Sequence, residues 1–192
     1  MPFDKLKKEV SLVMLKQLTL TKKVILLFLL VSVFSFSKDF WEKSNFMVNV
    51  TEDATFNGKR RSKSYVMTYN SGTMKLQITA PSVNKGEVYT FSGSKKTIYY
   101  PSLKQTVTQK VEKSEANILA VFNKLRGIKS KQTQTKNGDT FTFSNSKLVS
   151  IKSRGYTVSF SNYSTSNGYS YPKTITVRDG NSHVTYSLSN FR

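Results

Sequence analysis

Side chains that could carry out acid–base or metal chemistry are scarce in this sequence. The chain of 192 residues contains one histidine, His183, and no cysteine. A single imidazole without thiols excludes thiolate nucleophiles, disulfides and the common zinc sites. The acidic residues include adjacent Glu52 and Asp53 and the turn residues Asp139 and Asp179, but no spacing typical of a paired general acid and base. We therefore expect no catalytic residue, no metal site and no cofactor.

The composition after residue 37 favours β-structure. Ser and Thr make up 40 of these 155 residues and aromatic residues make up 20, and such side chains suit pleated, half-buried surfaces. Alternation of apolar and polar residues, which marks a strand with one buried face, recurs along the chain. It predicts about eleven strands, at residues 46–50, 65–69, 74–78, 87–92, 96–100, 106–111, 140–144, 147–153, 156–162, 174–178 and 183–188. Glycine-containing turns separate many of them, which predicts an antiparallel meander.

One segment near the middle of the chain has helical spacing instead. Residues 114–125 begin with Ser114, a suitable N-cap, and Gly127 follows their end. The apolar side chains at helical intervals are Ile118, Leu119, Val121, Phe122 and Leu125. We expect a lid helix whose face of Ile118, Leu119, Phe122 and Leu125 packs on the concave face of a strongly curved sheet. A shorter helical turn is expected at residues 38–43.

The first 37 residues differ from the rest of the chain. Two lysines precede an apolar run of 11 residues at 24–34, and the small residues Ser35 and Ser37 follow it. This order of parts is typical of a secretory signal peptide. A membrane anchor is the alternative, although a spanning helix needs about 20 apolar residues. We expect an N-terminal extension and cleavable signal peptide at 1–37, with cleavage between Ser37 and Lys38.

The chain after residue 37 is strongly basic. It contains 24 Lys and Arg residues against nine Asp and Glu residues, a formal charge of +15. Such a balance often indicates nucleic-acid binding, but here the lysines are scattered and only residues 59–63 form a cluster. Export also separates the protein from nucleic acid, so we expect no nucleic-acid partner. We interpret the charge as a solvated surface with peripheral contact to anionic membrane; a specific anionic partner is the alternative.

Three stretches carry a resemblance to a known family. Residues 74–81 read Met-Lys-Leu-Gln-Ile-Thr-Ala-Pro, residues 86–105 combine a strand, a Gly turn, a second strand and Tyr-Pro-Ser-Leu-Lys-Gln, and residues 171–177 read Tyr-Pro-Lys-Thr-Ile-Thr-Val. They resemble the corresponding stretches of periplasmic outer-membrane lipoprotein carriers, the LolA-like lipoprotein-sorting proteins. The best local match covers residues 63–109, and the order of elements extends the resemblance over the rest. Asn70 stands where these carriers place an arginine that helps to hold the lid closed.

The resemblance implies a fold that is mainly β with α: an incomplete, half antiparallel β-barrel of about eleven strands with a helical lid or plug. A single domain at 38–192 would form it. The implied function is that of a periplasmic carrier, which shields the acyl chains of lipoproteins in an apolar cavity and delivers them to the outer membrane. The implied partners are acylated lipoproteins or lipids, an inner-membrane lipoprotein transporter and an outer-membrane acceptor. We expect a monomer and no enzymatic activity.

Strand parity indicates which side chains would line such a cavity. If alternate residues face inward, the lipid-binding wall consists of Phe46, Val48, Tyr65, Met67, Tyr69, Met74, Leu76, Ile78, Tyr89 and Phe91. Apolar side chains suffice for this task, because each buried CH₂ of an acyl chain contributes about 0.8 kcal/mol. The alternative for these residues is a simple filled core.

Two other functions remain open. The first is an envelope lipid- or lipoprotein-sensing interaction module of the same fold, which regulates a membrane partner. The second and weakest is an envelope hydrolase that uses His183 and the acidic residues. Co-purification separates the first from a carrier, because a carrier brings down acylated molecules and a regulator brings down a specific membrane protein.

Overall fold

The computed structural model describes residues 37–111, 116–180 and 182–192. The signal peptide expected at residues 1–37, apart from Ser37, and the helix cap expected at Ser114 lie outside these residues. The elements are β1 (Lys38–Asp39), η1 (Phe40–Glu42), β2 (Asn45–Phe56), β3 (Lys59–Asn70), β4 (Thr73–Ala80), η2 (Ser82–Asn84), β5 (Val88–Ser92), β6 (Lys95–Tyr100), β7 (Gln105–Lys110), α2 (Ala116–Arg126), β8 (Gln134–Lys136), β9 (Asp139–Ser144), β10 (Lys147–Lys152), β11 (Tyr156–Ser166), β12 (Tyr169–Asp179) and β13 (Ser182–Ser189).

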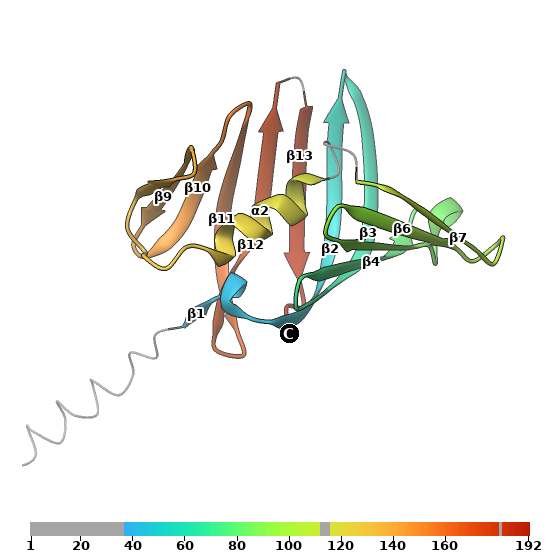
Figure 1. The fold of residues 1–192 in the computed structure, drawn as a ribbon, viewed down its shortest axis with the longest axis horizontal. Helices are drawn as coiled ribbons and strands as arrows, with labels where there is room; N and C mark the ends of the chain where they lie inside the picture. The colour runs from blue at the N-terminus through green and yellow to red at the C-terminus, as the bar shows by residue number, and fades with distance from the viewer. Residues whose placement is uncertain (1–36, 112–115, 181) are drawn as a thin grey trace, which may run out of the picture. The chain divides into compact units, whose positions relative to one another are not determined.

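All the described strands belong to one sheet. Its order is β7-β6-β5-β4-β3-β2-β13-β12-β11-β10-β9-β8, with antiparallel neighbours throughout, and β1 pairs in parallel with β12. The sheet is strongly curved but not closed, because β7 and β8 form its two edges (Figure 1). The expected half-barrel of antiparallel strands with one helix is therefore confirmed. The sheet has thirteen strands rather than eleven, since the two short strands β1 and β8 carry too few residues to show an alternating pattern.

Two long hairpins extend further than the alternation predicted. Strands β2 and β3 pair over their whole length, from Asn45 opposite Asn70 to Phe56 opposite Lys59. The residues between them, Asn57 and Gly58, both have positive φ, at 48° and 76°. This is the backbone of a type I′ turn, whose twist matches that of the flanking strands, and Asn-Gly is its preferred sequence. The dipeptide 167–168 plays the same part between β11 and β12.

The registers align the apolar residues of neighbouring strands into rows. Phe46 lies opposite Tyr69, Tyr69 opposite Met74, and Met74 opposite Phe91. A parallel row joins Val48, Met67, Leu76, Tyr89 and Ile98 in the same way. Because directly paired residues share a face of the sheet, these rows form one continuous apolar surface.

The predicted helix is present as α2, which lies against the inner face of the sheet across β11, β12 and β13 (Figure 1). The turn expected at residues 38–43 is the 3-10 helix η1, preceded by the short strand β1. Within η1, Phe40 and Trp41 are buried and their rings meet edge to face at 5.0 Å. Within the described part of the chain, no helix combines the length and the apolar character needed to cross a membrane.

Candidate ligand-binding site

The ten residues predicted to line a cavity lie together on the inner face of the sheet. Nine of them, all except Tyr89, are at most 5% exposed, and Tyr89 is half-buried at the rim of the same apolar cluster. Strands β2, β3, β4 and β5 supply all ten. The parity argument therefore selected buried residues of a common face, and their role as a lipid-binding wall stays a prediction.

Helix α2 packs its apolar residues into this face. The side chains of Val121, Phe122 and Leu125 are buried. The Phe122 ring centroid lies 4.7 Å from that of Tyr69, 5.2 Å from that of Phe46 and 5.8 Å from that of Phe40. Ile118 also belongs to α2, as does Leu119, but their side chains lie outside the described part of the structure.

The enclosed space beneath α2 is small. Its volume is about 30 Å³, which is close to the volume of one water molecule and far below the several hundred Å³ of a typical ligand site. Its wall is apolar and consists of Phe40, Phe46, Met67, Met74, Val121, Phe122, Leu125, Val158, Phe160, Ile175, Val177, Tyr186, Leu188 and Phe191. The helix itself fills the interior here, and the lid role expected for it stays a prediction, under which α2 would move aside for an acyl chain.

Eight of the fourteen residues of this wall were not among the residues predicted from the sequence. The missed residues come from β11, β12, β13 and the segments that flank the sheet: Phe40, Val158, Phe160, Ile175, Val177, Tyr186, Leu188 and Phe191. The alternation within segments 156–162, 174–178 and 183–188 carries the same signal that selected the first ten residues. The predicted cavity wall was limited to residues of β2 to β5 because the best local match to the carrier family, at residues 63–109, covers most of them.

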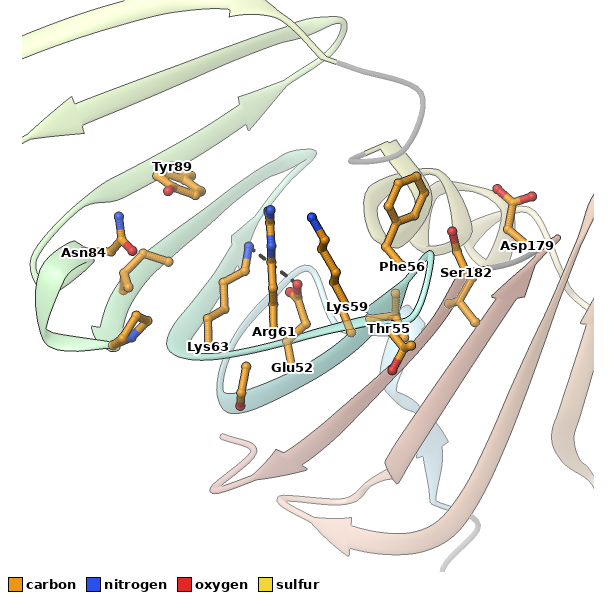
Figure 2. A pocket seen from close by; sticks show the side chains of 16 residues that line it. Glu52, Thr55, Phe56, Lys59, Arg61, Lys63, Asn84, Tyr89, Asp179 and Ser182 are labelled. Atoms are coloured by element: carbon orange, nitrogen blue, oxygen red, sulfur yellow. Dashed lines mark ion pairs between the residues drawn. The ribbon is translucent and has the colours of Figure 1, made fainter.

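A second, open pocket of about 790 Å³ lies at the end of the same inner face, beside the β2–β3 turn. Its residues are Glu52, Ala54, Thr55, Phe56, Lys59, Arg61, Ser62, Lys63, Ile78, Pro81, Asn84, Tyr89, Val177, Asp179, Ser182 and Val184. Figure 2 shows Lys59, Arg61 and Lys63 standing side by side on β3, close to Glu52 of β2. Val177 lines both the open pocket and the space beneath α2, so the two share a wall.

A small polar network marks the boundary between the open pocket and the apolar interior. The Nζ of Lys63 lies 3.5 Å from Glu52 Oε1, and the hydroxyl of buried Tyr65 donates to Glu52 Oε2 at 3.1 Å. Burial, followed by the nearby negative charge of Glu52, holds the pKa of Tyr65 well above its ordinary value. Tyr65 is therefore a neutral hydrogen-bond donor at any physiological pH.

A half-buried ion pair joins helix α2 to strand β9, near the β8 edge of the sheet. Lys124 Nζ lies 2.8 Å from Asp139 Oδ2 of β9 and also donates to Tyr156 Oη at 2.8 Å and to Ser153 Oγ at 3.1 Å. Burial raises the pKa of Asp139, but the hydrogen bonds from Lys124 and Ser153 outweigh that effect and hold it below its ordinary value of 3.8. We call this group, Lys124 with Asp139, Ser153 and Tyr156, the latch.

A second cation, Arg126 at the C-terminal end of α2, holds the helix to β3 and to the segment after η1. The guanidinium of Arg126 lies over the Tyr69 ring at 4.7 Å from its centroid and donates to the carbonyl oxygen of Lys43 at 3.4 Å. Tyr69 precedes Asn70, the position at which the carriers resembled by this sequence place their lid-holding arginine. In this chain Arg126 of α2 contacts the residue that precedes that position.

Removing the Asp139 charge should loosen the lid. In the variant Asp139→Asn, α2 loses an ion pair and the strongest of its charge-assisted hydrogen bonds, which are worth about 1.5–3 kcal/mol. We expect the apparent affinity for a neutral acyl fluorophore to rise about tenfold, because the open state becomes more populated. The control is Asp53→Asn, which removes an exposed carboxylate of β2 outside the latch. Equal affinities in the two variants would contradict the latch.

The same latch predicts an acid response. Because the pKa of Asp139 is lowered in the folded protein, its stabilising effect is fully present above 3.8 and is lost as the pH falls through that lower pKa. Titrating the wild-type protein below pH 3.8 should therefore raise acyl-probe binding, whereas Asp139→Asn should bind equally above and below that range.

The residues considered for catalysis do not come together. His183 is exposed on β13 and its Nε2 lies 3.2 Å from Thr185 Oγ1. Asp139 belongs to the latch, and Asp179 lies in the open pocket. Across residues 37–111, 116–180 and 182–192, no three His, Asp or Glu side chains gather in a way that could hold a metal ion.

Comparison with known proteins identifies the fold that carries this site. No family model and no curated protein matches the sequence. Among solved structures, a LolA superfamily protein from Nitrosomonas europaea is similar with a TM-score of 0.52 and 11% identity, over 82% of this chain and 89% of the other. A domain assigned to outer membrane lipoprotein sorting from Vibrio parahaemolyticus has a TM-score of 0.52 and 10% identity, over 81% and 86%. A DUF1329 family protein from Desulfovibrio piger has a TM-score of 0.51 and 11% identity, over 78% and 85%. The chain therefore has a LolA-like fold.

Proposed function

We propose that this protein is a carrier that shields the acyl chains of lipoproteins or lipids in the space between the sheet and α2. The observation that carries the proposal is a continuous apolar face on an open sheet, covered by a single helix that polar contacts hold at both sides. A helix held in this way can exchange its own apolar side chains for an acyl chain. The fold shared with LolA superfamily and lipoprotein-sorting proteins supports the same function.

The free energy of apolar burial favours replacement of the α2 side chains by an acyl chain over binding of the chain to an empty cavity. Closing α2 buries Val121, Phe122 and Leu125, and each such side chain contributes about 1.5–3 kcal/mol. An acyl chain of about sixteen carbons offers more apolar area than these three side chains, at about 0.8 kcal/mol per CH₂. The ligand can therefore displace the helix, and the helix protects the apolar face when no ligand is present.

Delivery to the outer membrane is the second part of the proposal. We propose that the working protein is periplasmic and begins at Lys38, after cleavage of a signal peptide. In support, the backbone N–H of Lys38 donates to the carbonyl oxygen of Gly168 at 2.9 Å, so the folded domain already includes that residue. We further propose a monomer that receives its ligand from an inner-membrane transporter and passes it to an outer-membrane acceptor.

Native mass spectrometry of the protein purified from its own envelope tests these points together. We expect a monomer whose mass matches residues 38–192, in complex with an acylated lipoprotein or an acyl lipid that solvent extraction identifies. An unliganded protein that also takes up no neutral acyl fluorophore would overturn the carrier function. Stable co-purification of one membrane protein without any acyl ligand would favour the regulatory module instead.

A further inference from the structure

The open pocket beside the β2–β3 turn has a row of cations on its inner wall. Residues 59, 61 and 63 alternate along β3 with Arg60 and Ser62, and they share a face with Tyr65, which is buried against the apolar interior. Figure 2 shows the three side chains projecting in the same direction into the pocket. Arg60 belongs to the opposite face and borders a different surface depression with His183 and Asp53.

Two of these three cations have no negatively charged partner among the described residues. Lys63 pairs with Glu52 at 3.5 Å. The side chains of Lys59 and Arg61 make no ion pair and no hydrogen bond with any described residue. The pocket contains one further acid, Asp179, at the end of β12. Like charges held side by side repel each other, and an anion bound among them would relieve that repulsion.

Apolar side chains also line this pocket, among several polar ones. Ala54 lies opposite Arg61 in the β2–β3 register, and Ile78, Val177 and Val184 belong to the same wall. Val177 also belongs to the wall beneath α2. A ligand with a charged end and an apolar chain therefore matches the arrangement, with its charged end among the cations and its chain on the apolar face that α2 covers, once the helix has moved aside.

We infer that the open pocket binds a headgroup of net negative charge on an acylated ligand, a phosphate headgroup without a compensating cation, with Arg61 and Lys59 as the binding residues. This inference rests on the proposed carrier function and specifies its ligand. The guanidinium of Arg61 offers a planar fork of donors that matches two phosphate oxygens, and Lys59 adds a second charge. The volume of about 790 Å³ accommodates a headgroup together with part of its chain.

Two lysolipids with the same palmitoyl chain test the inference. Lysophosphatidylglycerol carries a net negative charge, whereas lysophosphatidylcholine is zwitterionic. By displacement of a neutral acyl fluorophore, the wild-type protein should bind the anionic lipid about tenfold more tightly, and added salt should reduce that preference. The variant Arg61→Gln should abolish most of the preference while binding of the zwitterionic lipid stays unchanged, and Arg61→Lys should retain part of it.

The matched control is Arg60→Gln, which removes one charge from the adjacent residue on the opposite face. We expect it to keep the wild-type preference. Equal losses in Arg60→Gln and Arg61→Gln would overturn the inference in favour of a general effect of surface charge. Circular dichroism and thermal unfolding confirm that each variant is folded.

The remaining outcomes separate this inference from the carrier function. Equal binding of both lysolipids by the wild type would overturn the headgroup site and leave the carrier function standing. Failure to bind either lipid or the neutral fluorophore would overturn both. Binding of sn-glycerol 3-phosphate as tight as that of the anionic lipid would overturn the lipid headgroup and identify a site for a free phosphate compound.

Discussion

Replacing Phe122 by alanine should raise the apparent affinity for a neutral acyl fluorophore by about 100-fold. The Phe122 ring contacts the rings of Phe40, Phe46 and Tyr69, and its side chain is buried. Truncating a buried Phe to Ala costs about 3 kcal/mol or more, and here that cost falls on the closed state of α2 alone. Because binding requires the open state, apparent affinity rises with the open population until that state predominates.

Asn123→Ala is the matched control for this experiment, since Asn123 is exposed on the same turn of α2. Fluorophore titration and thermal unfolding are measured on both variants. The prediction requires that Phe122→Ala gains affinity while the sheet keeps most of its thermal stability. A large fall in melting temperature without any gain in affinity would show that α2 is a fixed part of the core and not a lid.

Replacing Leu76 by arginine should have the opposite effect and weaken acyl binding by at least about 100-fold. Leu76 is 5% exposed and lies between Met74, which lines the space beneath α2, and Ile78, which lines the open pocket. A charge at position 76 opposes any acyl chain that passes from the space beneath α2 to the open pocket. Burying an unpaired charge costs several kcal/mol.

The fold should survive this change. Two residues along a strand span about 6.6 Å, which is within reach of an arginine side chain. The new guanidinium can therefore extend past Ile78 to the solvent of the open pocket while its stem stays buried. Gln77→Arg is the control, because Gln77 is exposed on the other face of β4. Retained acyl binding by folded Leu76→Arg would remove this face from the ligand path, and loss of folding would make Leu76 a simple core residue.

The alternation of apolar and polar residues predicts where the strands lie better than it predicts where each strand begins and ends. Alternation located the buried segments because side chains in a strand point to opposite faces with a period of two. It failed at residues 59–64, where the cations of β3 interrupt the apolar pattern although the strand continues to the turn at 57–58. Those same cations line the open pocket, so the local departure from the pattern coincides with the candidate site.

The contacts that hold α2 on the sheet could not have been predicted from spacing. Lys124 and Asp139 belong to different elements, and only the path of the chain through β8 brings them together. The sequence indicated Asp139 as a turn residue, and it does begin β9 directly after the 137–138 turn. Its second role as a buried partner of Lys124 depends on where α2 crosses the sheet, which no local rule specifies.

The order of strands has a consequence for folding. Strands β2 to β7 follow one another as hairpins, and so do β8 to β13, but the centre of the sheet joins β2 to β13. During synthesis β2 to β7 emerge before β13, so one edge of β2 has no partner strand until the end of the chain emerges. Contacts between distant parts of a chain form slowly, and uncovered apolar sheets aggregate in the meantime. We therefore expect pairing of β2 with β13 to be a late step in folding, and until it occurs the unpaired edge of β2 is open to pairing with other chains.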